Sequence, residues 1–234
     1  MTWKRRFRWS GCKVVGFVYP VFAEASSTID LQGFAHPSLQ EPRVNSLAFR
    51  EGGTGMVLTG SNMAGKSTLL RAVGLCVYLA HLGFPVPALK MTLPPLSGVL
   101  TTINLPDNPA DGLSHFAQEI KRLEQIMPHL KQGRRLLLLF DELFKGTNAA
   151  GAHASTVAVL ERLSHFPESY FIVSTHVAGL QSALRKNEVL HFKKMETTFV
   201  AGQPVHSYQL VDGVCEDPIG FRLLQRSGVL GEQD

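Results

Sequence analysis

Residues 60–67 read Gly60-Ser-Asn-Met-Ala-Gly-Lys-Ser67 and match the pattern G-x-x-x-x-G-K-[ST] at every fixed position. A short apolar stretch from Gly55 to Thr59 precedes this motif, and residues with helical periodicity follow from Lys66 to Leu82. A strand, a glycine-rich turn and a helix in that order predict a phosphate-binding loop. The turn points backbone N–H groups at phosphate oxygens, and the helix N-terminus adds the positive end of its dipole. The alternative interpretation is a glycine-rich turn before a buried helix.

The side chains of this loop suit a nucleoside triphosphate bound with Mg²⁺. The ammonium group of Lys66 would contact the β- and γ-phosphates, and the hydroxyl group of Ser67 would bind the metal ion. The residues expected to bind the nucleotide are Gly60, Ser61, Asn62, Met63, Ala64, Gly65, Lys66, Ser67 and Thr68.

An acidic pair, Asp141 and Glu142, directly follows the apolar run Leu136 to Phe140. In a parallel α/β sheet, ligands bind at the carboxyl ends of the strands. We expect Asp141 to hold Mg²⁺ through water and Glu142 to polarise an attacking water as a general base. Two adjacent carboxylates favour hydrolysis over transfer to a bound acceptor. The alternative is an acidic cap of the following helix.

Three further polar segments are candidates for the same site. Ser174-Thr-His176 follows the apolar run Tyr170 to Val173 and would lie near the γ-phosphate, although a lone histidine is often structural. Residues 111–127 are amphipathic with roughly helical spacing, and Ser114, near the start of this stretch, could simply be the N-cap of the helix. Residues 146–148 read Gly-Thr-Asn and either border the nucleotide or form an ordinary turn.

Strands that alternate with helices along the chain predict an α/β fold. We expect a P-loop nucleotide-binding domain with a mostly parallel central sheet flanked by helices, together with an antiparallel β portion. The antiparallel portion comes from short strands within residues 12–50 and from a hairpin of residues 188–200 and 205–210. The remaining expected elements are a strand at 98–103, a helix at 149–163 and a last helix at 218–225.

Length and composition fit a single domain without covalent crosslinks. The chain has 234 residues, of which 44% are hydrophobic and 18% charged, and its net charge is +4. That charge permits a nucleic-acid partner without indicating one. Three dispersed cysteines favour a reducing, cytoplasmic location, and the histidines show no zinc-binding spacing. We assign residues 1–30 to an N-terminal segment, for which a remnant of an upstream domain is one interpretation, and residues 31–230 to the nucleotide-binding domain.

The N-terminus resembles a secretory signal in part. Residues 1–25 combine a basic start, a short apolar stretch and small residues, but Gly16 and Pro20 interrupt the apolar stretch. We therefore expect a solvated terminus that is retained. No apolar run approaches the length of a membrane span, so no membrane partner is expected.

Taken together, the motifs resemble the ATPase domain of the MutS family of DNA mismatch-repair proteins, which belongs to the ABC-type ATPases. The resemblance covers about residues 36–228. It rests on Thr59-Gly-Ser-Asn-Met-Ala-Gly-Lys-Ser-Thr68, Asp141-Glu-Leu-Phe-Lys-Gly-Thr-Asn148, Ser174-Thr-His176, Ser114-His-Phe116 and Glu119.

The resemblance implies an ATPase with ATP and Mg²⁺ as ligands and a composite site in a dimer. The partner would be a second copy or a related MutS-like subunit, and Ser114 would reach the γ-phosphate bound by that partner. Duplex DNA, mismatched or branched, would be bound through upstream regions. The residues to which the resemblance assigns catalysis are Glu142, Lys66, Asn62 and His176. Those assigned to Mg²⁺ are Ser67 and Asp141.

Two departures from the family's pattern bear on DNA binding and on adenine stacking. The mismatch-reading, connector, lever and clamp regions have no counterpart in these 234 residues. The aromatic residue that many members place just before Asn45 is replaced by Pro42, Arg43 and Val44, so the Arg43 guanidinium is the candidate to stack on adenine. Two alternatives stay open. One is a nucleotide-gated interaction module that does not bind DNA, and the other is a P-loop kinase acting on a small molecule.

Overall fold

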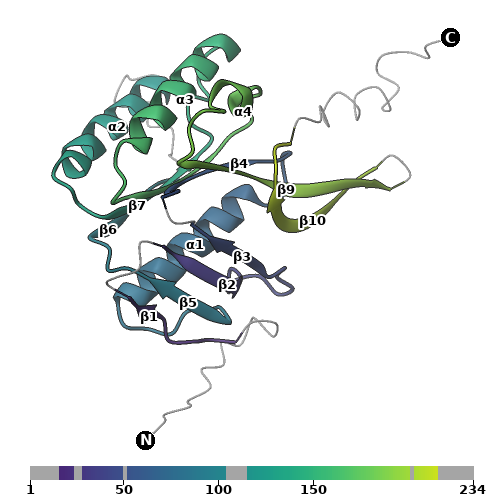
Figure 1. Ribbon diagram of the computed structural model, residues 1–234. Helices are drawn as coiled ribbons and strands as arrows, with labels where there is room; N and C mark the ends of the chain where they lie inside the picture. Colours follow the sequence, from purple (N-terminus) through teal and green to yellow (C-terminus); the bar gives the residue numbers. More distant parts are fainter. Residues whose placement is uncertain (1–15, 24–27, 50–51, 104–114, 201–202, 216–234) are drawn as a thin grey trace, which may run out of the picture.

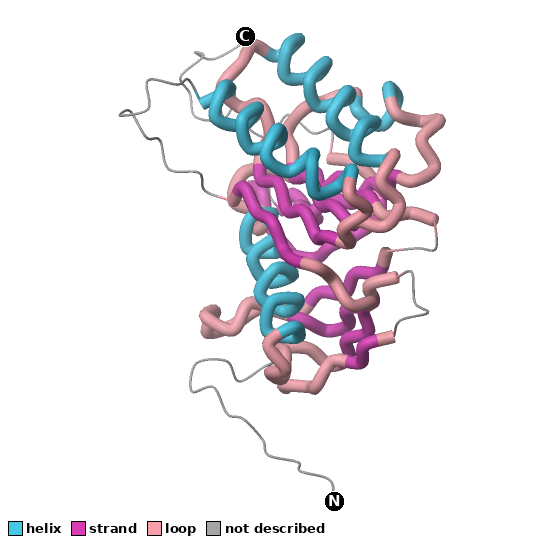
Figure 2. The backbone as a smooth tube through the Cα atoms, turned by 90° about the vertical axis from the view of Figure 1, so that its left-hand side faces the viewer, coloured by secondary structure: helices cyan, strands magenta, loops and turns pink. Residues whose placement is uncertain are grey.

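The computed structural model describes residues 16–23, 28–49, 52–103, 115–200 and 203–215. The described chain forms two sheets with one long helix between them (Figures 1 and 2). The central sheet has the strand order β10-β9-β4-β8-β7-β6 and the smaller sheet the order β1-β5-β2-β3.

The central sheet is parallel except at one edge. Parallel pairing joins β6 (Gly98–Thr102), β7 (Leu136–Asp141), β8 (Tyr170–Ser174), β4 (Gly55–Thr59) and β9 (Leu190–Val200). The last strand, β10 (Gln203–Asp212), pairs antiparallel to β9 and projects with it as a long hairpin (Figure 1). The expected mostly parallel sheet and terminal hairpin are both present.

Helices cover both faces of this sheet. Helix α1 (Lys66–His81) lies between the two sheets, whereas α2 (His115–Lys131), α3 (Ala149–Ser164) and the short α4 (Leu180–Ala183) cover the other face (Figure 1). Strand β7 shows why its leucine run is continuous. Leu137 and Leu139 belong to the core around α1, whereas Leu136 and Leu138 belong to the core beneath α2 and α3.

The smaller sheet packs on the opposite side of α1. It consists of β1 (Val21–Phe22), β5 (Lys90–Leu93), β2 (Asp30–Phe34) and β3 (Asn45–Ala48). Strand β5 was not expected from the sequence, because its alternation covers only four residues and its partner β2 lies far away in the chain. The sheet brings residues 34–45 beside the start of α1, which positions one wall of the site described below.

One expected helix is longer than predicted, and another lies outside the described residues. The described helix α2 runs to Lys131 and contains Pro128, so its predicted end at Met127 is wrong. The helix continues because Leu130, one turn beyond Ile126, is still buried in the core beneath it. The expected helix at 218–225 lies outside the described residues. Among the described residues, no helix combines the length and apolar character that crossing a membrane requires.

Candidate nucleotide-binding site

The glycine-rich loop joins β4 to α1 and has the backbone that its sequence predicts. Gly60 and Gly65 have φ angles of 150° and 99°, values that side chains disfavour. A Cβ atom on Gly60 would lie 3.1 Å from Cβ of Met195, and one on Gly65 would lie 3.2 Å from Cδ1 of Tyr208. Both glycines are therefore required by conformation and by close packing.

The N-terminus of α1 is open to an anionic ligand. Its capping residue, Gly65, makes no side-chain cap, and the first turn contains no acidic residue. The first N–H groups of a helix have no partner within the helix, and the dipole makes this end positive. A phosphate group would accept hydrogen bonds from these N–H groups and would be attracted by the positive end of the dipole.

Lys66 is a buried residue whose ammonium group contacts two backbone carbonyls and His176. The residue is 5% exposed. Its Nζ lies 2.8 Å from the Gly60 carbonyl, 3.0 Å from the Ser61 carbonyl and 3.1 Å from Nε2 of His176. None of the ion pairs among the described residues includes it. Burial lowers the pKa of Lys66, and the charges of Glu142 and Asp141 oppose that shift. A bound anion would stabilise the ammonium group.

The ends of β7 and β8 bring the acidic pair beside this lysine. Asp141 and Ser174 are register partners, and the Ser174 hydroxyl donates to Oδ1 of Asp141 at 2.5 Å. The backbone N–H of Glu142 donates to the Ser174 carbonyl at 3.0 Å. Ser174 therefore orients both acidic residues at the carboxyl edge of the sheet.

The Glu142 carboxylate has two side-chain partners, Lys145 and His176. Its Oε2 lies 2.9 Å from Nζ of Lys145, and its Oε1 lies 2.6 Å from Nε2 of His176. Burial alone would raise the pKa of Glu142, but the hydrogen bond from Lys145 and the neighbouring His176 outweigh it, so the pKa lies below its usual value. Glu142 is thereby kept in the ionised form that a base requires.

His176 bridges the two sides of the site through a single nitrogen. Its Nε2 is within hydrogen-bonding distance of both Lys66 and Glu142. Because Nε2 either donates or accepts, it bonds to Glu142 in one tautomer and to Lys66 in the other. The resulting Lys66–His176–Glu142 arrangement links the phosphate loop to the acidic pair.

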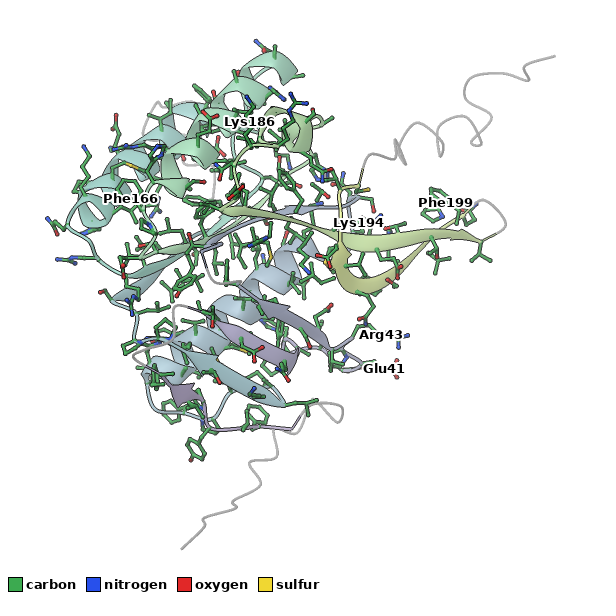
Figure 3. The ribbon with its side chains drawn as sticks, in the orientation of Figure 1. Glu41, Arg43, Phe166, Lys186, Lys194 and Phe199 are labelled. Atoms are coloured by element: carbon green, nitrogen blue, oxygen red, sulfur yellow. The ribbon has the colours of Figure 1, made fainter. Side chains whose placement is uncertain are left out.

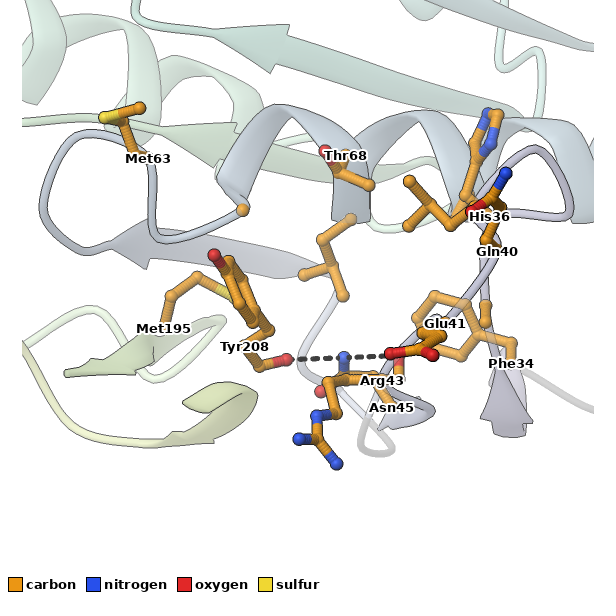
Figure 4. A pocket seen from close by; sticks show the side chains of 15 residues that line it. Phe34, His36, Gln40, Glu41, Arg43, Asn45, Met63, Thr68, Met195 and Tyr208 are labelled. Atoms are coloured by element: carbon orange, nitrogen blue, oxygen red, sulfur yellow. Dashed lines mark hydrogen bonds between the residues drawn. The ribbon is translucent and has the colours of Figure 1, made fainter. Parts of the chain in front are cut away.

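A cavity of about 350 Å³ opens beside the loop. Its walls come from the β2–β3 connection, the phosphate loop, α1 and the β9–β10 hairpin, and include Arg43, Met63, Thr68 and Tyr208 (Figure 4). Arg43 and Glu41 lie below the β9–β10 hairpin in the view of Figure 3. A planar group bound here would adjoin the phosphate loop.

Tyr208 is a wall residue that the sequence analysis missed. It lies at an irregularity of the β9–β10 pairing, with a φ angle of 57°. The amide of Asn45 donates to the Tyr208 carbonyl at 2.9 Å and accepts from the N–H of Leu210 at 2.7 Å. This contact spans 163 residues, so no local sequence pattern predicts it.

Comparison with known proteins decides the family. The family model of MutS domain V matches residues 56–230, which is more than half of the chain. The chain belongs to the MutS family.

Several MutS-family relatives align with most of the chain. It is 32% identical over 173 residues to the mitochondrial DNA mismatch repair protein MSH1 of Arabidopsis thaliana, covering 74% of this chain and 15% of the relative. It is 30% identical over 177 residues to MutS of Geobacillus thermodenitrificans, covering 74% of this chain and 19% of the relative. It is 27% identical over 220 residues to MutS of Petrotoga mobilis, covering 92% of this chain and 27% of the relative. The chain thus spans a small part of each relative's length.

Within this MutS-family site, the structure places the expected residues unequally. Lys66, Asp141, Glu142 and His176 are brought together as described above, and Ser67 follows Lys66 in the first turn of α1. Most of the remaining expected residues lie in the phosphate loop or the cavity wall: Ser61, Asn62, Met63, Ala64 and Thr68. The last, Ser114, lies outside the described residues.

Two smaller expectations can also be placed. Ser61 Oγ lies 3.2 Å from the hydroxyl of Thr197 on β9. Asn148 is the N-cap of α3, and its side chain accepts a hydrogen bond from the N–H of Gly151 at 2.8 Å. Thr147, one residue earlier, lines a second cavity together with Glu142 and His176.

Proposed function

We propose that this chain is an ABC-type P-loop ATPase domain of a MutS-like protein that acts in DNA mismatch repair or another form of DNA maintenance. The observation that carries the proposal is the buried ammonium group of Lys66, which lies between the open N-terminus of α1 and the His176–Glu142 pair. A positive pocket beside a carboxylate base suits hydrolysis of a phosphoanhydride.

The loop would bind the triphosphate of ATP. The first N–H groups of α1 and the ammonium group of Lys66 would contact the phosphates, with Asn62 beside the γ-phosphate. Lys66 would exchange its bonds to the Gly60 and Ser61 carbonyls for phosphate oxygens. The adenine would occupy the cavity of about 350 Å³, where Tyr208 and Arg43 offer a ring and a guanidinium plane for stacking.

The donor set also fits Mg²⁺. Ser67 and Asp141 supply oxygen ligands, which this hard cation prefers. Ser174 already orients the Asp141 carboxylate. Mg²⁺ is commonly held by one or two carboxylates together with water and substrate phosphates. When bound, Mg²⁺ would neutralise charge on the phosphates.

Glu142 would act as the general base. Its lowered pKa keeps the carboxylate ionised, and its position next to His176 and Lys66 points it toward the γ-phosphate end of the loop. It would orient a water molecule for attack and accept its proton. His176 would hold the carboxylate in place through its Nε2.

The proposal extends to a dimer switch controlled by ATP and coupled to DNA. The partner would be a second copy or a related MutS-like subunit, and Ser114 would contact the γ-phosphate held by that partner. ATP should then raise the mass of a Glu142→Gln variant toward that of a dimer in light scattering. Binding to duplex DNA should weaken steeply with salt if the chain contacts phosphates directly. An unchanged mass with and without ATP would count against the switch.

ATP binding and product analysis test the enzymatic core. Lys66→Ala should weaken ATP binding by about ten- to a hundredfold, because charge-assisted hydrogen bonds contribute roughly 1.5–3 kcal/mol. The control is Lys90→Ala, which removes a largely exposed lysine of the smaller sheet. Free phosphate as the product indicates a hydrolase, whereas a phosphorylated acceptor indicates a kinase. Equal ATP affinity in both variants would contradict the site.

A further inference from the structure

Helix α2 contributes a buried carboxylate to the loop that carries the acidic pair. Glu119 is 3% exposed, and its Oε1 accepts a hydrogen bond from the backbone N–H of Phe144 at 3.0 Å. Phe144 lies two residues beyond Glu142, in the connection between β7 and α3. The motif-based roles assigned above include neither residue of this bond.

The loop that receives this hydrogen bond has an unfavourable backbone. Glu142 and Phe144 have φ angles of 54° and 63°, in the left-handed region that non-glycine residues rarely adopt. Such a conformation persists only where surrounding contacts over-determine it. The first of these residues is held by the Ser174 carbonyl, to which the Glu142 N–H donates.

The second residue of this loop with a positive φ angle, Phe144, is held by residues of α2. The Phe144 N–H donates to Glu119, the residue is 2% exposed, and the Phe144 ring packs on that of Phe116 with centroids 5.4 Å apart. Ser174 and Glu119 therefore fix the loop at two points on either side of Leu143. The direction of the Glu142 side chain depends on both.

From this arrangement we propose that Glu119 is a positioning residue for hydrolysis. Its carboxylate oxygen holds the strained loop in the conformation that points Glu142 at His176 and the phosphate loop. The inference rests on the proposed ATPase function. It predicts an effect on the chemical step rather than on ATP affinity, because the hydrogen bond from Phe144 to Glu119 fixes the loop that carries Glu142.

Two substitutions separate geometry from charge. Glu119→Gln keeps an oxygen acceptor at the same distance from the backbone but removes the charge. Glu119→Asp keeps the charge but withdraws the acceptor by one methylene group. Small misplacements of catalytic groups cost up to about a hundredfold in rate, so Glu119→Asp should lower kcat by about ten- to a hundredfold. Glu119→Gln should stay within about threefold of the wild type.

The experiment measures kcat, KM and the ATP dissociation constant for the wild type, both Glu119 variants, Glu142→Gln and the control Glu124→Asp. Glu124 is an exposed residue of α2, so its variant should behave as the wild type. Circular dichroism and thermal melting establish that each variant is folded. The expected result is a lowered kcat in Glu119→Asp, with ATP affinity within about threefold of the wild type.

Three results would overturn the inference. They are an unchanged kcat in Glu119→Asp, a larger loss in Glu119→Gln than in Glu119→Asp, and a loss of ATP affinity with kcat intact. If Glu119→Asp does not fold, Glu119→Gln decides, since a folded Gln variant as slow as Glu142→Gln refutes a role for the oxygen acceptor. Failure of the proposed function is distinct, because hydrolysis would then be absent in the wild type or unaffected in Glu142→Gln.

Discussion

Asn45 joins the smaller sheet to the β9–β10 hairpin, and its removal should weaken both the fold and ATP binding. The residue is 8% exposed. Its side chain bonds the Tyr208 carbonyl at 2.9 Å and the Leu210 N–H at 2.7 Å. Substitution by Ala deletes both bonds and leaves two backbone groups of an irregular strand without these partners.

The size of the effect follows from those two groups. A buried polar group left unsatisfied costs about 1–3 kcal/mol, and both groups here are only partly buried, so water can replace part of the loss. We therefore expect Asn45→Ala to lower the free energy of unfolding by about 1–3 kcal/mol. For a chain of this length that corresponds to a fall in Tm of roughly 2–12 °C. Because Tyr208 lines the cavity, ATP affinity should fall as well.

The assay combines urea unfolding followed by circular dichroism with titration of ATP. The matched control is Gln209→Ala, which removes a longer, exposed bond of 3.4 Å between the same two segments. That variant should change stability by less than about 0.5 kcal/mol. The reasoning is refuted if Asn45→Ala and Gln209→Ala unfold at the same urea concentration and bind ATP equally.

Three other predictions concern the pH dependence, the packing and the cysteines. Lys145→Ala removes a hydrogen bond that lowers the pKa of the proposed general base against the effect of burial. The acidic limb of the kcat/KM profile should therefore move to higher pH, by less than about one unit because this lysine is largely exposed, and an unmoved limb contradicts the assignment. Gly55→Ala places a Cβ atom 2.3 Å from Cζ of Phe171 and should cost about 1–3 kcal/mol in urea unfolding. Gly98→Ala meets its nearest atom at 3.7 Å and should be nearly neutral, so equal losses in the two would refute the packing argument. Burial raises the pKa of Cys76 to about 12, so mass spectrometry should find it unlabelled by a thiol reagent at pH 8 until the chain is denatured, and rapid labelling of the folded protein would contradict this.

Elements built from local patterns were predictable from the sequence. The β4–loop–α1 unit follows from a motif whose glycines have the positive φ angles that the turn needs. The leucine run of β7 also matched, because a short continuous apolar run is typical of a parallel strand covered on both faces. The acidic pair lies beside Ser174 and His176 because parallel strands end at the same edge of the sheet.

Features that depend on distant contacts were not predictable. Strand β5 exists because β2 pairs with it across about sixty residues, and the residues 90–93 alone carry too weak a pattern. Tyr208 enters the cavity wall through an irregular strand pairing fixed by Asn45. Helix α2 continues past Pro128 because tertiary packing outweighs the local cost of the proline. In each case the deciding interaction comes from another part of the chain.

The most direct test of the central claim is phosphate release by Glu142→Gln at saturating ATP and Mg²⁺. The amide keeps the shape of the side chain but cannot accept a proton, and a general base contributes about 10²- to 10⁴-fold to a rate. We expect turnover to fall by at least about a hundredfold while ATP binding is retained. Turnover equal to that of the wild type, with ATP bound equally well, would contradict the assignment of Glu142 and with it the proposed ATPase site.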